Sequence, residues 1–432
     1  MNDDRRFERA AQQWLELGPN QAPDHAVQAV LAAISTTPQE RGLRAPWRTL
    51  HMSAFVRVGV ASAAALSILI ASLGLLPWRL PPGPGTNVTA TPGPLPPTAC
   101  PSGSPLPSGT IATIAGTGAL ASTGDGGPAL DAAISVPQSL AVDAAGNVYF
   151  GDRGGSVRRI RTDGVMEAFA SGLSVPGPVA FGPDGSLFVA DNDDGTQHYS
   201  TIKRIAPDGT VTTVAGTGVL GSTGDEGPGV QAQINNAGTL AVGPDGSLYF
   251  DDSNRYRTID PAGVIHTFAG TGATGFSGDG GPATDATFGN FAYGEVGVAV
   301  AQDGTVYLGD GGNSRVRKVD PSGTIMTVAG NGRPGRAGDG GPAIEAQLNA
   351  SPYGLGLDAS GNLFVADWNN ADVRRIDAAG IITTVAGTYQ GFSGDCGPAT
   401  AAAMYGPVAV APYNGALFIA EQGNDRIRMI VP

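Results

Sequence analysis

Acidic and basic side chains recur in matched sets along residues 139–430. Six acids each end a short apolar segment: Asp152, Asp191, Asp252, Asp310, Asp367 and Glu421. Six bases take the second position of the segment that follows: Arg158, Lys203, Arg257, Arg317, Arg374 and Arg428. If the two segments are antiparallel neighbours, each acid can approach a base. The set is either a charged ring for an ionic ligand or six structural ion pairs and turn caps, and we favour the structural interpretation.

A second set of carboxylates lies in glycine-rich loops. The loops read GDGGPA or a close variant, at residues 124–129, 224–229, 278–283, 338–343 and 394–399. The aspartate could ligate a cation or cap backbone N–H groups of the turn. Five near-identical copies favour the structural role, because a functional site usually breaks the symmetry of a repeat. The loop at residues 171–178 lacks the motif.

Catalytic chemistry has little support in these residues. His198 and His266 fall on different expected elements and do not make a three-ligand zinc site. Cys396 replaces a glycine of its loop, with no histidine near it in sequence. We therefore expect no catalytic residue, no metal site and no cofactor, while a carboxylate-held metal near the axis of the fold stays open.

Departures from the repeat are the better guide to a partner site. One loop is lengthened at residues 192–200, and another is altered before residue 297. Exposed aromatic side chains mixed with acids suit recognition of a polypeptide or glycan, although such rings could instead fill gaps between repeats. The predicted binding residues are His198, Tyr199, Phe291, Tyr293, Glu295 and Trp368.

The repeats themselves predict the fold. Six segments with alternating small residues, such as SLAVD at 139–143, each precede an Asp-Gly-like turn and a second strand. The last repeat stops at residues 427–430 without its closing strand, and an orphan copy of that strand, IATIAG, stands at 111–116. A ring in which the N-terminal strand completes the last blade explains this offset and hides the sheet edges. The sequence therefore predicts an all-β, six-bladed β-propeller.

These motifs resemble the NHL repeat, in the GDGGPA-loop variety that also occurs in the propeller of teneurins. The resemblance rests on the five glycine-rich loops, the flanking TVAG strands and turns such as VDPSGTI, and it covers nearly all of residues 110–432. It implies a binding platform, with a few lyases and hydrolases among related propellers. The lyase relatives use histidine-bound zinc, which the two histidines here do not match.

The N-terminal quarter of the chain predicts other elements. Residues 1–52 are expected to form a helical tail, residues 53–78 a transmembrane helix, residues 79–109 a proline-rich linker, and residues 110–432 the propeller. The uncharged run at 58–76 would span roughly 28 Å. Four arginines precede it and one, Arg79, follows closely, so the N-terminus is expected in the cytoplasm and the propeller outside it. The predicted localisation is the cell membrane, with a single span.

Composition limits the classes of partner that the chain is expected to bind. A formal charge of -13 argues against nucleic acid, which would need a basic patch. The two cysteines, Cys100 and Cys396, could form one bridge or stay as two thiols.

We expect a non-catalytic binding, sensing or adhesion module for a protein, a peptide or a cell-wall glycan. Residues 1–45 either dock a cytoplasmic partner or serve only as a solubilising tail. The alternative is an extracytoplasmic metal-dependent lyase or lactonase-like hydrolase.

Overall fold

The computed structural model describes residues 98–100, 106–192, 200–290, 296–349 and 352–432. The predicted helical tail, the apolar run at 58–76 and nearly all of the proline-rich linker lie outside these residues. Expectations about the tail and its partner therefore stay predictions.

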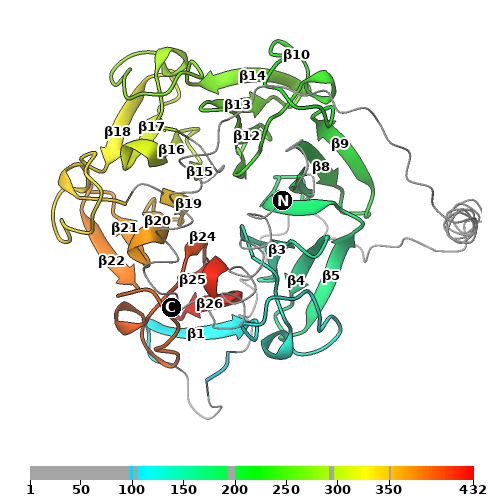
Figure 1. Cartoon of the computed structure of the whole chain (residues 1–432), viewed down its shortest axis with the longest axis vertical. Coiled ribbons are helices and arrows are strands. Elements are labelled where there is room, and N and C mark those ends of the chain that lie inside the picture. Colours follow the sequence, from blue (N-terminus) through cyan, green and yellow to red (C-terminus); the bar gives the residue numbers. More distant parts are fainter. Residues whose placement is uncertain (1–97, 101–105, 193–199, 291–295, 350–351) are drawn as a thin grey trace, which may run out of the picture. The chain divides into compact units, whose positions relative to one another are not determined.

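Six antiparallel sheets form the described part of the chain and stand around a common centre (Figure 1). This is the all-β, six-bladed propeller that the repeats predicted. Blade 1 contains β2 (Ala141–Val142), β3 (Val148–Asp152), β4 (Ser156–Ile160) and β5 (Met166–Ser171). Blade 2 contains β6 (Val175–Phe181), β7 (Leu187–Asn192), β8 (Thr201–Ile205) and β9 (Val211–Ala215).

The next two blades follow the same order. Blade 3 contains β11 (Leu240–Val242), β12 (Leu248–Asp251), β13 (Tyr256–Ile259) and β14 (Val264–Ala269), with the short strand β10 (Gly227–Pro228) added outside β14. Blade 4 contains β15 (Val298–Val300), β16 (Val306–Asp310), β17 (Arg315–Val319) and β18 (Ile325–Ala329).

The last two blades complete the ring. Blade 5 contains β19 (Pro352–Leu357), β20 (Leu363–Asp367), β21 (Asp372–Ile376) and β22 (Ile382–Ala386). Blade 6 contains β24 (Pro407–Tyr413), β25 (Ala416–Glu421), β26 (Arg426–Ile430), β1 (Thr110–Ala115) and, outside β1, the short strand β23 (Gly397–Pro398).

Closure joins the two ends of the repeat region. Strand β1 pairs antiparallel with β26, with Ile111 opposite Ile430 and Thr113 opposite Arg428. The orphan copy of the closing strand thus supplies the outer strand of the last blade, as its sequence predicted. A disulfide joins Cys100, just before β1, to Cys396 in the loop before β23.

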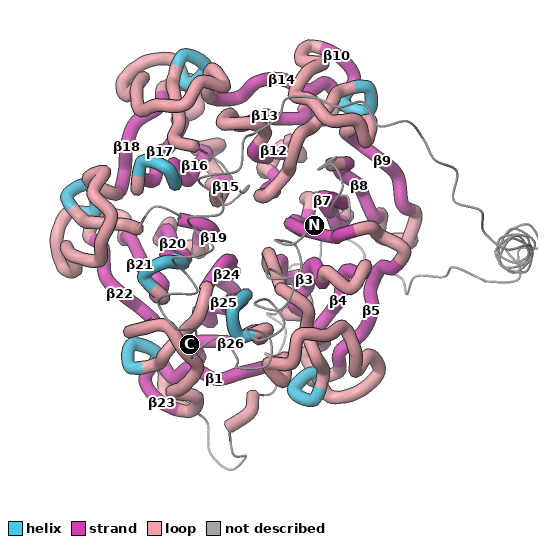
Figure 2. Tube along the Cα trace, viewed as in Figure 1, coloured by secondary structure: helices cyan, strands magenta, loops and turns pink. Residues whose placement is uncertain are grey.

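Short 3-10 turns interrupt the loops between strands (Figure 2). Each has three residues: η1 (Ala129–Asp131), η2 (Gly229–Gln231), η3 (Ala283–Asp285), η4 (Gly311–Asn313), η5 (Ala343–Glu345), η6 (Trp368–Asn370), η7 (Ala399–Ala401) and η8 (Gln422–Asn424). Five of them, η1, η2, η3, η5 and η7, follow the glycine-rich loops.

The prediction of a single-pass membrane protein is contradicted. Among the residues that the structure describes, no helix is long and apolar enough to cross a membrane. The helical segments found there are turns of three residues, whereas a span needs about 20.

Apolar cores lie between neighbouring blades. Between blades 6 and 1, for example, Ile114 and Phe418 join Phe150 and Met166 in one buried cluster. Since every blade is covered on both faces by its neighbours, second strands such as LFVAD read as nearly continuous apolar runs. The packing between blades fixes where the loops that carry charged residues emerge.

Candidate functional site

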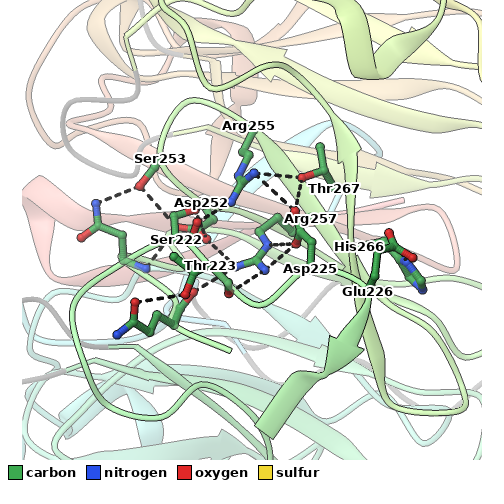
Figure 3. Close-up of polar contacts among 12 residues, drawn as sticks. Ser222, Thr223, Asp225, Glu226, Asp252, Ser253, Arg255, Arg257, His266 and Thr267 are labelled. Carbon is green, nitrogen blue, oxygen red and sulfur yellow. Dashed lines mark hydrogen bonds and ion pairs between the residues drawn. The ribbon is translucent and has the colours of Figure 1, made fainter. Parts of the chain in front are cut away.

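A buried arginine occupies the third strand of five blades. These side chains are fully buried: Arg158, Arg257, Arg317, Arg374 and Arg428. In blade 3, Nη1 of Arg257 donates to Asp252 Oδ2 at 2.9 Å and Nε donates to Asp225 Oδ1 at 3.0 Å (Figure 3). Backbone carbonyls of Thr223 and Gln233 accept two further hydrogen bonds. One guanidinium thus fastens the glycine-rich loop to the hairpin of the blade that follows it.

The same arrangement recurs in three other blades. Arg158 pairs with Asp125 at 2.9 Å and Asp152 at 3.0 Å. Arg317 lies 2.7 Å from Asp279 and 3.8 Å from Asp310. Arg428 lies 2.7 Å from Asp395 and 3.2 Å from Glu421. The structure therefore pairs the aspartate of the GDGGPA loop with an arginine, a partner that the sequence analysis missed.

Blade 2 shows how the sequence could have revealed that the loop aspartate pairs with the buried arginine. Its entry loop has no GDGGPA motif, and the base on its third strand is Lys203. Lys203 Nζ contacts a single carboxylate, Asp191 Oδ2, at 2.5 Å. A lysine is a compact point charge, whereas a guanidinium can bridge two acids. The joint loss of the loop aspartate and the arginine was the sequence signal that the two belong together.

Hydrogen bonds from the outer strand hold the other oxygen of several loop aspartates. Thr267 Oγ1 donates to Asp225 Oδ2 at 2.6 Å, and Thr327 Oγ1 donates to Asp279 Oδ2 at 2.6 Å. Burial alone would raise the pKa of Asp225 and Asp279. Hydrogen bonds from the threonine and the arginine outweigh it, so both pKa values lie below the usual range for aspartate.

The six acids that end the second strands are all buried, together with five of the six bases. Charges held away from solvent in this way cannot present themselves to a ligand in solution. Their contacts within each blade, to bases, to backbone N–H groups and to asparagines, are structural.

Blade 5 departs from the common arrangement. Asp372 stands two residues before the buried Arg374, at the position where blades 3, 4 and 6 have Arg255, Arg315 and Arg426. The cation comes instead from the loop, since Arg336 Nε donates to Asp372 Oδ2 at 2.6 Å. Asp372 is also the cross-strand partner of Asp367, so two acids lie side by side.

This pairing changes the proton affinity of both acids. Burial, reinforced by the charge of Asp372, raises the pKa of Asp367 to about 7. Burial raises the pKa of Asp372 to about 6, against the opposing attraction of Arg336 and Arg374.

Five of the predicted binding residues fall outside the described residues: His198, Tyr199, Phe291, Tyr293 and Glu295. Trp368 is described. It begins η6 and is half-buried against blade 6, where a Cβ added to Gly406 would lie 2.6 Å from its Nε1. Whether Trp368 binds a partner stays a prediction.

His266 lies on the outer strand β14, away from the inner strands of the ring (Figure 3). Its Nδ1 is 3.0 Å from Glu226 Oε1, and its Nε2 is 3.5 Å from Asp260 Oδ2. In the described part of the chain, no group of three or more His, Cys, Asp or Glu side chains could hold a metal ion.

Three exposed aromatic side chains lie in one segment of blade 6, residues 389–405: Tyr389, Phe392 and Tyr405. The segment folds back on itself, since the Met404 N–H donates to the Tyr389 carbonyl at 3.1 Å. Tyr405 packs over Gly423 in η8, and its neighbour Gly406 packs against Trp368. We call Tyr389, Phe392, Tyr405 and Trp368, which lie on loops of blades 5 and 6, the aromatic patch; of these, sequence reasoning singled out Trp368.

The fold and the repeated charge network define a closed six-bladed β-propeller built from one recurring unit. The sequence profile of the teneurin NHL domain matches residues 331–404, which span blade 5 and the loop after it. Over these residues the chain matches an NHL-repeat propeller domain.

Relatives share this region over a small part of their own length. Human teneurin-1 is 29% identical over 365 residues, which cover 74% of this chain and 13% of teneurin-1. The Arabidopsis thaliana protein SUPPRESSOR OF QUENCHING 1, chloroplastic, is 42% identical over 83 residues, which cover 19% of this chain and 8% of that protein.

Solved structures share the fold. A Bacteroides thetaiotaomicron protein of unknown function has a TM-score of 0.56 and 21% identity, over 74% of this chain and 75% of its own. An auxiliary nutrient binding protein from the same organism has a TM-score of 0.56 and 16% identity, over 74% and 76% of the two chains.

Proposed function

We propose that this NHL propeller is a non-catalytic binding module that holds a protein, a peptide or a glycan on the face bearing the aromatic patch. The observation that carries the proposal is the exposure of Tyr389, at 63%, and of Tyr405, at 42%, beside the half-buried Trp368. Aromatic side chains grouped on loops of a rigid scaffold are typical of recognition surfaces.

The charge network supports the same proposal. Because the repeated acids and bases are paired with one another inside the blades, these charges need no ligand to compensate them. Loops on such a ring can differ from blade to blade without disturbing the fold. The aromatic patch occupies loops of this kind on blades 5 and 6.

The test compares two paired substitutions in the full chain. Tyr389→Ala with Tyr405→Ala should reduce capture of a partner at least tenfold while the thermal transition stays unchanged. Leu120→Ala with Val219→Ala, which removes exposed apolar side chains from loops of other blades, is the matched control and should bind normally. Equal capture by both variants would exclude this patch as the site.

The alternative, a metal-dependent lyase or lactonase-like hydrolase, makes a different prediction. It requires stoichiometric divalent metal in the purified chain and loss of ligand binding after chelation. Binding that is indifferent to chelation would support the module proposed here.

A further inference from the structure

A pocket of about 470 Å³ opens on the outer rim of blade 5. Its lining comes from the glycine-rich loop, the outer strand β22 and the loop of the next blade, namely Arg336, Asp339, Thr384, Gly387, Thr388 and Thr400. The volume lies within the range of small-ligand sites, but such sites are usually lined by apolar side chains. This lining has no apolar side chain at all.

Two lining residues of the pocket, Arg336 and Thr400, replace apolar residues that neighbouring blades carry at the same positions. Arg336 stands three residues before the loop aspartate, where blades 4 and 6 have Phe276 and Phe392. Those phenylalanines lie over Arg315 and Arg426, each 4.0 Å from ring centroid to guanidinium carbon.

Thr400 stands five residues after the next loop aspartate. The corresponding residues at the rims after blades 4 and 6 are Ile344 and Leu130. Blades 4 and 6 are therefore apolar at both positions, whereas blade 3 has the hydroxyls of Ser222 and Thr284 there, and Arg336 is the charged residue that distinguishes blade 5.

The two charged groups of the pocket are held in fixed orientations. Arg336 donates to Asp372 Oδ2 at 2.6 Å, to the Gly387 carbonyl at 2.8 Å and to the Thr388 carbonyl. These contacts use three of the five N–H groups of a guanidinium. Since the side chain is 38% exposed, the other two can face a ligand.

Asp339 supplies a fixed acceptor. Its Oδ1 accepts from Arg374 Nη2 at 2.6 Å and its Oδ2 from the Thr384 N–H at 3.1 Å, while 48% of the side chain is exposed. Each carboxylate oxygen keeps further lone pairs for a ligand.

Two buried polar atoms of residues that contact Arg336 and Asp339 lack a hydrogen-bond partner among the described residues. They are Asp372 Oδ1 and Arg374 Nε. In blades 1, 3, 4 and 6 the corresponding arginine Nε donates to the loop aspartate at 2.9–3.0 Å. Gly387, which lines the pocket, packs directly on Asp372, since an added Cβ would lie 2.7 Å from its Cα. Blade 5 thus lacks the hydrogen bond from the arginine Nε to the loop aspartate that blades 1, 3, 4 and 6 have. The loss of this structural contact beside the pocket favours a role of the pocket in binding.

We infer that this rim pocket binds a neutral polyhydroxylated ligand, a mono- or disaccharide unit. Sugar hydroxyls both donate and accept, which suits a lining with a guanidinium, a carboxylate and threonine hydroxyls. Thr388 Oγ1 already donates to the Ala402 carbonyl at 2.8 Å, but it can still accept a hydrogen bond. The carboxylate of Asp339 opposes an anionic ligand and the guanidinium of Arg336 opposes a cationic one. The exposed ring of Tyr389 follows Thr388 directly in the chain. The inference goes beyond the proposed function, because none of the residues that line the pocket belongs to the aromatic patch.

The experiment titrates the full chain with glucose, galactose, mannose, N-acetylglucosamine, cellobiose and chitobiose, using saturation-transfer NMR at concentrations on the order of ten millimolar. Glucuronate serves as the anionic probe and protonated glucosamine as the cationic probe. Binding of at least one neutral sugar, with neither charged probe binding, is the expected result. Binding of a charged probe alone, or of no sugar, would overturn the inference.

Two variants locate the site. Thr400→Ile restores the residue of a neighbouring rim and should weaken sugar binding at least tenfold, whereas Thr284→Ile at the rim after blade 3 should not. Arg336→Phe combined with Asp372→Arg installs the arrangement of blades 4 and 6 and should abolish binding while the chain stays folded. Unchanged binding in Thr400→Ile would sink the inference. Partner capture through Tyr389 and Tyr405 is measured separately, so a failed sugar titration leaves the proposed function testable on its own.

Discussion

Cys100 and Cys396 are joined by a disulfide although 296 positions separate them in sequence, and their Cα atoms lie 5.5 Å apart. The bond ties the segment before β1 to the last glycine-rich loop. The Cys396 N–H also donates to the Ile111 carbonyl at 2.8 Å, so a covalent link reinforces the strand that closes the ring. Of the two states that the sequence left open, the structure has the bridge.

Breaking this bond is expected to destabilise the propeller. Cross-linking a long loop restricts the unfolded chain, and removing such a bond typically costs ~2–5 kcal/mol. Cys100→Ser should therefore lower the free energy of unfolding by an amount in that range, measured by denaturant titration.

Cys396→Gly separates the covalent effect from the backbone effect. Cys396 has a φ of 66°, at a loop position where three of the other four loops have glycine. Glycine adopts this conformation without strain, so the variant should lose less stability than Cys100→Ser. An equal loss in both variants would show that the backbone at this position carries no strain. Under reducing conditions, Cys100→Ser and the natural chain should unfold at the same denaturant concentration.

Replacing a buried arginine should lower the free energy of unfolding more than replacing the partly exposed lysine of blade 2. Arg257→Met would leave Asp252 without its cation and Asp225 with only the longer contact to Arg255, and breaking a buried pair typically costs ~3–5 kcal/mol. Lys203→Met in blade 2 should cost less, about 1–3 kcal/mol, because Lys203 is 24% exposed and pairs with one acid only. Chemical denaturation of both variants gives the comparison. A larger loss for Lys203→Met would contradict the role given to the bridging arginines.

Asp367 predicts a pH dependence of stability. Its pKa in the folded chain is about 7, above the usual value near 3.9, so the folded state keeps a proton that the unfolded state releases. The contribution to stability is complete below about pH 4 and is lost as pH rises through 7, with a slope of up to about 1.4 kcal/mol per pH unit.

Asp367→Asn should flatten this slope between about pH 4 and pH 7. The free energy of unfolding measured at several pH values in that window provides the test. Asp285→Asn, which removes an exposed carboxylate, is the control for loss of one negative charge and should leave the slope unchanged. An unaltered slope in Asp367→Asn would assign the titration to other groups, Asp372 first among them.

His266 offers a second titration. The hydrogen bond to Glu226 raises the pKa of His266, burial opposes it, and the weaker contact with Asp260 adds to the increase. Stability from these contacts is present below the ordinary histidine pKa near 6.5 and is lost as pH rises through the higher folded value.

Glu226→Gln should lower the His266 pKa, followed by NMR of the imidazole protons across pH 5 to about 9. Asp260→Asn should lower it less, because Asp260 lies 3.5 Å away rather than 3.0 Å. A larger shift in Asp260→Asn would reverse the assignment of the main partner.

Much of the architecture follows from the sequence alone. The fold class, the six blades and the closing strand at 111–116 could be predicted, because each repeat carries its own strand periodicity and turn residues. The pairing of Asp152 with Arg158 followed from hairpin geometry, since the acid and the base are neighbours in one sheet.

Only the tertiary structure decided which residues meet across loops. Asp225 lies 32 positions before Arg257, and Arg336 lies 36 positions before Asp372, so nothing local specifies either contact. The same holds for the bond between Cys100 and Cys396, and for the rim pocket formed where two blades and two loops come together. Repetition determines how each blade folds, whereas the packing of blades around the ring determines which side chains from different loops are brought within bonding distance.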